Sequence, residues 1–204
     1  MLESLISFSI ATILLAFSPG PDNLYVITQS LVNGTKSGIA TTLGLVSGCI
    51  IHTTLLAFGV SAIISASYSL FYILKVIGAF YLLYLAYQVF KSETTLKLDA
   101  SITKKTPFKL FKQGVLMNLM NPKILIFFLA FFPGFLWDKT ENIIFQFYVL
   151  GIVFMLISFI VFSFLAFLAG YISSSWTKNQ LVLSFLKWLQ IIVFIGIAIF
   201  ILIP

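Results

Sequence analysis

The sequence predicts an all-α membrane protein of six transmembrane helices, and its composition and segment lengths carry that prediction. The chain has 204 residues, of which 60% are hydrophobic and 9% charged, and its mean hydropathy is +1.11. Soluble domains contain about 45–50% apolar and about 25% charged residues, so a soluble fold is excluded. A helix needs about 20 apolar residues to cross a bilayer, so this length holds six crossings and no further domain.

Six apolar segments are separated by polar residues, at approximately 4–31, 38–65, 68–90, 113–136, 143–172 and 181–203. The segments are long and do not alternate between apolar and polar residues, which favours helices over the strands of a barrel. We therefore expect a single transmembrane domain over residues 1–204. Its halves are about 1–90 and 113–204, joined by the polar residues 91–112.

The connection 91–112 predicts the orientation of the chain. It holds six lysines, at positions 91, 97, 104, 105, 109 and 112, against Glu93 and Asp99. Basic loops stay in the cytoplasm, so 91–112 is placed inside and both termini outside, although Lys75 near an outer helix end opposes this scheme. The formal net charge of +6 therefore reflects topology, and we expect no nucleic-acid partner. The single Cys49 rules out an internal disulfide.

Two helices are interrupted by proline at membrane depth. Proline lacks the backbone donor of a helix and clashes with the preceding turn, so each site breaks or kinks its segment. Pro21 and Pro122 suit the first position of a new half-helix, with Gly20 or Ser18 and Asn121 as caps. The breaks comprise Ser18, Pro19, Gly20, Pro21 and Asp22 in the first segment, and Asn121, Pro122 and Lys123 in the fourth.

The two breaks occupy equivalent positions. Alignment of Pro21 with Pro122 sets Asp22 against Lys123, and each break lies in the first helix of a three-helix half. Each half crosses the membrane an odd number of times, so the two halves run in opposite senses. Broken helices 1 and 4 in two inverted three-helix repeats are typical of transporters that bind substrate at the midplane.

The charges at the breaks have a functional and a structural interpretation. An ionised group at the membrane centre costs about 2.5–3.5 kcal/mol on insertion scales, so such groups are usually paired or functional. Lys123 would also stand at the helix end where the dipole disfavours a cation. Structurally, prolines often only kink helices, Asp22 suits a helix N-terminus, and the two charges could simply pair with each other.

Gly44, Gly48 and His52 recur every four residues on one face of the second segment. Glycines at this spacing indicate a close helix contact. His52 is the single histidine of the chain. It is either an interhelical hydrogen-bonding residue or, because imidazole titrates near neutral pH, a proton relay beside Asp22.

These motifs together resemble the lysine exporter family, in particular its homoserine/threonine-efflux branch. The resemblance rests on Ser-Pro-Gly-Pro-Asp at 18–22, on Gly-Val-Leu-Met-Asn-Leu-Met-Asn-Pro-Lys at 114–123, and on the segment 75–82 around Gly78. Residues 186–190 of the last segment depart from the pattern because they lack its small residues. The resemblance implies a six-helix protein of the bacterial inner membrane that exports amino acids, driven by the electrochemical gradient.

A zwitterionic amino acid would then bind between the two breaks. Its ammonium group would face Asp22, and its carboxylate would lie near Lys123 and the free amides of a half-helix. The other polar groups expected at this depth are Asn118, Asn121, Asn23 and Ser18. We expect no cofactor and no metal; lipid surrounds the chain, which could also pair with a second copy of itself.

Two other functions are compatible with the scaffold. One is export of a metal or another cation, although Asp22, Cys49 and His52 are not at metal-ligand spacing. The other is an intramembrane enzyme that uses Asp22 and His52. This is less favoured, because the chain has neither paired aspartates nor a zinc-type His-Glu-x-x-His motif.

Overall fold

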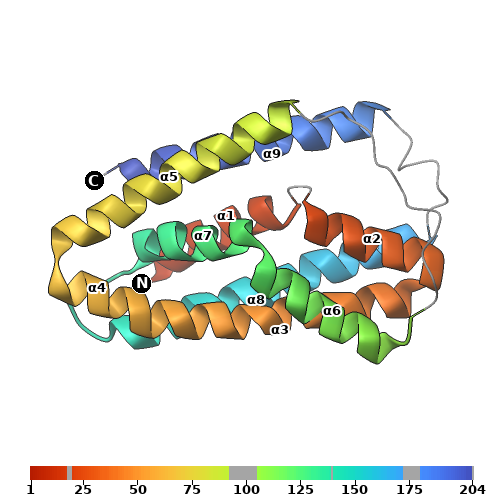
Figure 1. Cartoon of the computed structure of the whole chain (residues 1–204), viewed down its shortest axis with the longest axis horizontal. Coiled ribbons are helices and arrows are strands. Elements are labelled where there is room, and N and C mark those ends of the chain that lie inside the picture. The colour runs from red at the N-terminus through yellow and green to blue at the C-terminus, as the bar shows by residue number, and fades with distance from the viewer. Residues whose placement is uncertain (18–19, 92–104, 139, 172–179, 204) are drawn as a thin grey trace.

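The computed structural model describes residues 1–17, 20–91, 105–138, 140–171 and 180–203, within which every regular element is a helix (Figure 1). The α-helices are α1 (Leu2–Phe17), α2 (Pro21–Asn33), α3 (Thr35–Leu55), α4 (Ser61–Ala66), α5 (Tyr68–Lys91), α6 (Pro107–Met120), α7 (Pro122–Phe131), α8 (Ile143–Tyr171) and α9 (Gln180–Leu202). A π-helical turn, η1 (Leu56–Val60), joins α3 to α4, and a 3₁₀ turn, η2 (Phe132–Phe135), follows α7.

The helices confirm a multi-pass membrane protein. Three of them, Thr35–Ile64, Ser69–Lys91 and Ile143–Ala169, are long and apolar enough to cross a bilayer. Two further pairs qualify as broken spans, α1 with α2 at 58° and α6 with α7 and η2 at 53°. The last apolar stretch, Lys187–Leu202, is shorter. Each of the six segments expected from the sequence thus corresponds to a helix or to a bent pair of helices.

The start of the fourth segment was predicted too late. Helix α6 begins at Pro107, whereas the hydrophobic pattern placed the boundary at 113. Thr106 caps this helix because its hydroxyl accepts a hydrogen bond from the Lys109 amide at 3.4 Å, and Pro107 fills the first helical position. Lys109 and Lys112 therefore lie on a helix and not in the basic connection, of which residues 92–104 lie outside the described part.

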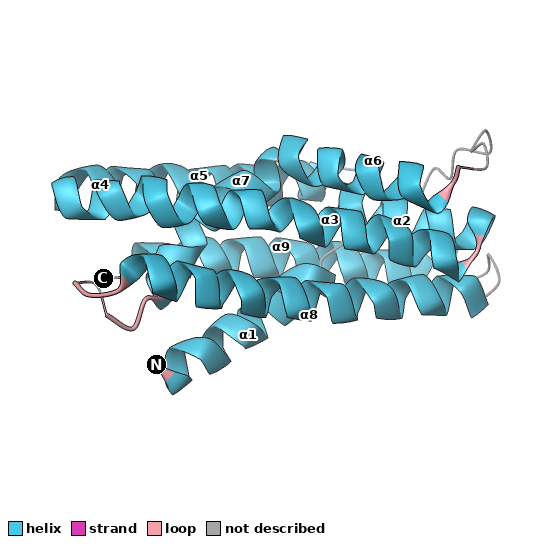
Figure 2. Ribbon diagram, turned by 90° about the horizontal axis from the view of Figure 1, so that it is seen from below, coloured by secondary structure: helices cyan, strands magenta, loops and turns pink. Residues whose placement is uncertain are grey.

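The two broken spans run in opposite directions. In Figure 1, α1 and α2 lead from the end of the bundle that holds both termini to the other end, and α6 and α7 lead back. Helix α3 packs against α2, α6 and α8, while α5 packs against α7 and α9. Figure 2 shows the same arrangement from below, with α8 alongside α3 and the N-terminal part of α1 inclined away from the bundle.

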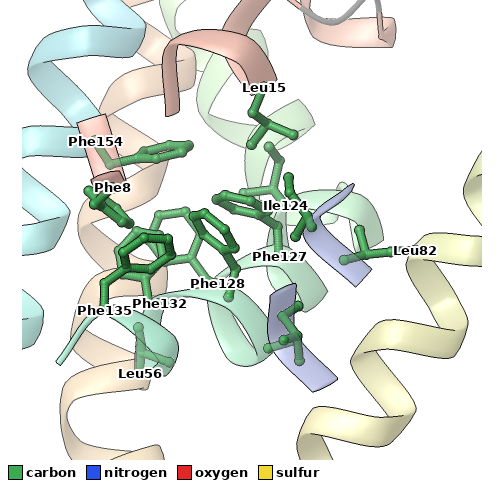
Figure 3. Packing of buried hydrophobic residues seen from close by; sticks show 14 of the residues in the cluster. Phe8, Leu15, Leu56, Leu82, Ile124, Phe127, Phe128, Phe132, Phe135 and Phe154 are labelled. Carbon is green, nitrogen blue, oxygen red and sulfur yellow. The ribbon is translucent and has the colours of Figure 1, made fainter. Parts of the chain in front are cut away.

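A cluster of phenylalanines fixes α7 and η2 against α1 and α8 (Figure 3). Phe8 of α1 is fully buried and stands edge-on to Phe132, with ring centroids 4.9 Å apart. Phe128 stacks on Phe132 at 4.1 Å and meets Phe154 of α8 edge-on at 5.0 Å. Lipid is as apolar as these rings, so association within a membrane depends on close packing of this kind. The cluster therefore holds the second break in register with the first.

Glycines allow the closest helix contacts. A Cβ atom on Gly44 would lie 2.0 Å from the carbonyl oxygen of Phe111, and one on Gly114 would lie 2.5 Å from that of Thr41. A Cβ atom on Gly48 would lie 2.6 Å from Oδ1 of Asn118. These three positions bring α3 and α6 into backbone contact. Gly78 serves the α5–α7 crossing, where an added Cβ would lie 2.1 Å from the Cβ atom of Ala130.

The connection between η2 and α8 is held by Gln146. Its Oε1 accepts from the amides of Trp137 and Asp138 at 2.9 and 3.1 Å, and its Nε2 donates to the carbonyl of Glu141 at 2.8 Å. The partly exposed Asp138 carboxylate accepts from the hydroxyl and amide of Thr140 and from the amide of Glu141. These bonds lower the pKa of Asp138, so their stabilising effect is present at neutral pH and lost as pH falls through that lowered value.

Gly44→Ala should destabilise the protein, because the added methyl group meets the backbone of Phe111 and forces α3 and α6 apart. Overpacking of this kind costs about 1–3 kcal/mol. Gly59→Ala is the matched control, since its added Cβ meets nothing within 4 Å and alanine is the better helix former. The measurement is thermal unfolding of the purified protein in detergent, and equal stability of the two variants would contradict this account of the contact.

Candidate substrate site at the two helix breaks

The second half of each broken span begins in the same way. Pro21 opens α2 after Gly20, whose backbone is extended at φ −154° and ψ 176°, and Pro122 opens α7 after Asn121 at φ −81° and ψ 105°. The Leu24 amide donates to the Gly20 carbonyl at 3.0 Å, and the Leu125 amide donates to the Asn121 carbonyl at 3.2 Å. Ser18 and Pro19 lie outside the described residues.

The second break leaves a carbonyl that a side chain of another helix satisfies. In a continuous helix the amide of residue 122 would donate to the carbonyl of Asn118, but Pro122 has no N–H. That carbonyl instead accepts from the Asn121 amide at 3.1 Å and contacts Nε2 of His52 at 3.2 Å. A carbonyl can only accept, so Nε2 carries the proton. His52 of α3 therefore stabilises the break in the α6–α7 span.

The first break is bridged by Asn23. Its Nδ2 donates to the carbonyl of Ala16 at 2.7 Å, across the interruption and within the buried interior. The last carbonyls of a helix have no partner in their own helix, and a buried one is costly if unpaired. Asn23 thus ties the end of α1 to the start of α2. The sequence predicted that Asn23 binds substrate, but its Nδ2 donates to the protein backbone.

One hydrogen bond joins the two breaks directly. Nδ2 of Asn121 donates to Oδ2 of Asp22 at 3.1 Å, and both side chains are more than nine-tenths buried. The residues are 99 positions apart in the chain. Lys123 lies in the first turn of α7, but its side chain is outside the described part, so its predicted pairing with Asp22 stays a prediction.

A small cavity lies at this junction. Its volume is about 30 Å³, which is room for about one or two water molecules. Its lining includes the break residues Gly20, Pro21, Asp22, Asn23 and Asn121. Ala16, Leu15, Ile124, Phe154, Ser158 and Phe162 complete the lining. The cavity therefore combines the polar groups of the two breaks with mostly apolar neighbours.

Two residues that the sequence predicted at the site, Asn118 and His52, lie at the contact between α3 and α6 and do not line the cavity. Asn118 does not line the cavity; its Nδ2 donates to Sγ of Cys49 at 3.5 Å. His52 also lies off the cavity, with its ring 5.6 Å from that of Phe128. Buried Nδ1 of His52 and Oδ1 of Asn118 have no hydrogen-bond partner among the described residues.

Sequence reasoning missed Ser158 and Gln146, and it assigned no packing role to Gly114. Ser158 lies with Ser163 in a long apolar run, and such serines usually bond to their own helix. Gly114 stood only within the family motif, because its contacts Thr41 and Gly44 are on another helix. Gln146 lies near the end of a predicted segment, where a polar residue is expected and indicates no specific role.

Two other features of the described residues bear on the site. No three His, Cys, Asp or Glu side chains gather there in a way that could hold a metal ion. A larger groove of about 510 Å³ runs between α1 and α9, but its lining is apolar apart from Ser7. The charged and amide groups therefore identify the smaller cavity as the candidate site.

Comparison with known proteins identifies the family of the chain. A model of LysE type translocators matches residues 13–204. This chain belongs to the LysE type translocator family. It is 32% identical over 180 residues to the leucine efflux protein of Salmonella typhimurium, an alignment that covers 86% of this chain and 84% of the relative.

Two further members of the translocator family show similar identity. The homoserine/homoserine lactone efflux protein of Salmonella typhimurium is 30% identical over 85% of this chain and 83% of its own. The membrane protein YrhP of Bacillus subtilis, which is uncharacterized, is 30% identical over 88% of this chain and 89% of its own. No solved structure matches the chain.

His52→Leu should destabilise the protein by about 1 kcal/mol, because the Asn118 carbonyl loses one buried donor. His52→Gln should retain most of the stability, since its Nε2 amide can donate at the same place. Thermal unfolding in detergent compares the two variants with the wild type. Equal stability of the Leu and Gln variants would show that the bond from His52 does not support the break.

Proposed function

We propose that this protein is a secondary transporter that exports amino acids or related small zwitterions across the bacterial inner membrane. The observation that carries the proposal is the Asn121–Asp22 hydrogen bond, which joins two helix breaks from opposite halves of the chain at a buried cavity. Relatives named for leucine and homoserine efflux supply the substrate class. Movement of a solute needs no covalent chemistry, so the protein acts as a transporter and not as an enzyme.

Asp22 and the half-helix starts would hold the two ends of the zwitterion. The ammonium group faces Asp22, whose carboxylate also accepts from Asn121. The carboxylate lies near the N-terminus of α2, which has no side-chain cap, and near Lys123 of α7. Asn121 and Asn23 line the cavity and add hydrogen bonds to the substrate. Asn118 does not line the cavity, and its Nδ2 donates to Cys49 of α3. Ser18 stays a candidate at the same break.

Two inverted halves would provide alternating access. Equivalent cap bonds at Gly20 and Asn121, bends of 58° and 53°, and the opposite directions of the broken spans support the repeat. The pairs α3–α8 and α5–α9 each join equivalent helices of the two halves, an arrangement compatible with a pseudo-twofold axis in the membrane plane. Rocking of one half against the other would open the cavity, which is too small for an amino acid in the closed form.

His52 has two roles to be distinguished. Its bond to the Asn118 carbonyl supports the structural one, and the alternative is a proton relay near Asp22. The His52→Gln variant retains a donor but cannot titrate. Efflux with an unchanged pH dependence in that variant would rule out the relay.

Asp22→Asn and Lys123→Gln should each reduce efflux at least tenfold while the protein remains in the membrane, because the prolines that form the breaks are untouched. Each change also leaves the opposite charge uncompensated at a depth where that is costly. Efflux is measured from cells loaded with dipeptides as amino-acid sources. The exposed residues Glu3 and Lys36 supply matched controls as Glu3→Gln and Lys36→Gln.

The variant that combines Asp22→Asn with Lys123→Gln distinguishes two roles for these charges, which either bind the two ends of the substrate as a clamp or only pair with each other. With both charges removed, a purely structural pair would recover, whereas a clamp would have lost its partners for both ends of the substrate. Full efflux in either single variant would contradict the clamp. Efflux restored in the double variant would leave only the structural pair.

The orientation is proposed from the loop charges. We place the connection 91–112 in the cytoplasm and both termini outside, in agreement with the two termini lying at one end of the bundle (Figure 1). In a Cys49→Ala background, Lys105→Cys should resist an impermeant thiol reagent in intact cells and Thr140→Cys should react. The reverse labelling pattern would invert the topology.

A further inference from the structure

Ser158 is a buried polar residue of the cavity that the proposed zwitterion contacts do not use. It lies in the middle of α8 and is 3% exposed. Phe154 and Phe162, four residues before and after it, line the same cavity, so all three occupy one face of α8. This face contributes to the lining of the cavity together with Asp22 and Asn121.

The hydroxyl of Ser158 differs from six other helical hydroxyls among the described residues. Serine and threonine within helices commonly donate to the carbonyl four residues back. Those that do so here are Ser9, Thr28, Ser37, Thr41, Thr42 and Thr54. Ser158 forms no such bond to the described Phe154, and the residue lines the cavity. A buried hydroxyl in a membrane interior is costly unless an occupant of the cavity pairs with it.

The position of Ser158 relative to the breaks indicates which part of a substrate it meets. In the proposed function the α-amino and carboxylate groups are bound by Asp22 and the half-helix starts, which leaves the other lining residues to contact the side chain. Those residues include Leu15, Ile124 and the α8 face. Among them, Ser158 supplies the polar group and the other residues supply apolar surface.

We propose that Ser158 determines substrate specificity by hydrogen bonding to a hydroxyl on the side chain of the exported amino acid. This inference rests on the proposed function. An apolar side chain leaves the serine hydroxyl unpaired, whereas a side chain such as that of homoserine satisfies it. Sites that hydrogen-bond a substrate hydroxyl discriminate strongly against analogues without it, while an apolar pocket discriminates weakly. Ser158 therefore favours hydroxylated over purely aliphatic amino acids.

The test compares efflux of L-homoserine and L-leucine by the full-length protein in proteoliposomes, as the ratio of their Vmax/KM values. Ser158→Ala should lower the homoserine-to-leucine ratio about tenfold, through KM for homoserine, with leucine efflux maintained. Ser158→Thr keeps a hydroxyl and should preserve the ratio. Ser163→Ala is the matched control, because Ser163 is on the same helix and does not line the cavity.

The outcomes separate this inference from the proposed function. An unchanged ratio in Ser158→Ala, or an equal loss for both amino acids, would overturn the role of Ser158 while leaving amino-acid export intact. The same shift in Ser163→Ala would also overturn it, because the effect would not belong to the cavity. A wild-type protein that transports neither amino acid would contradict the proposed function and this inference together.

Discussion

Backbone carbonyls that the two helix breaks leave without their usual partners are the constraint on which the interior of this protein depends. Lipid offers no donor to satisfy them, so each needs a donor from the protein. Asn23 supplies one for Ala16 at the first break, and His52 supplies one for Asn118 at the second. Asn121, next to the second break proline, reaches Asp22 at the first break. The polar residues at the breaks are therefore positioned by the breaks themselves.

Close packing of α3 on α6 makes the bond from His52 possible. Any side chain at position 48 would collide with Asn118, and any at 44 with the backbone of Phe111. With glycine at both positions, α3 approaches closely enough for His52 to reach the carbonyl of Asn118. On the opposite side, the phenylalanine cluster holds α7 against α1 and α8. The site is thus fixed by steric contacts on one side and aromatic packing on the other.

The proposed function connects this cavity to transport. Its polar lining comes from both halves of the chain, so in that proposal the cavity opens when the halves separate at the Asn121–Asp22 contact. A single hydrogen bond contributes about 0.5–1.5 kcal/mol net, or more when one partner is charged. A substrate ammonium that competes for Asp22 can offset a loss of that size. In the proposed function, substrate binding and the separation of the two halves are thereby linked through the Asp22 carboxylate.

The sequence by itself determined the class of protein, the six segments and the two breaks. Apolar run length and proline chemistry are local properties, and they act in the same way in any tertiary context. The start of α6 was misplaced because the cap at Thr106 and Pro107 lies in a polar stretch that hydropathy does not resolve. The grouping of Asp22 with Asn121 could be proposed from the alignment of the breaks. Tertiary structure alone decided three other placements. Asn118 donates to Cys49, Asn23 donates to the Ala16 carbonyl, and Ser158 lines the cavity. A side chain near a break can serve either the backbone or the cavity, and only the neighbouring helices select between them.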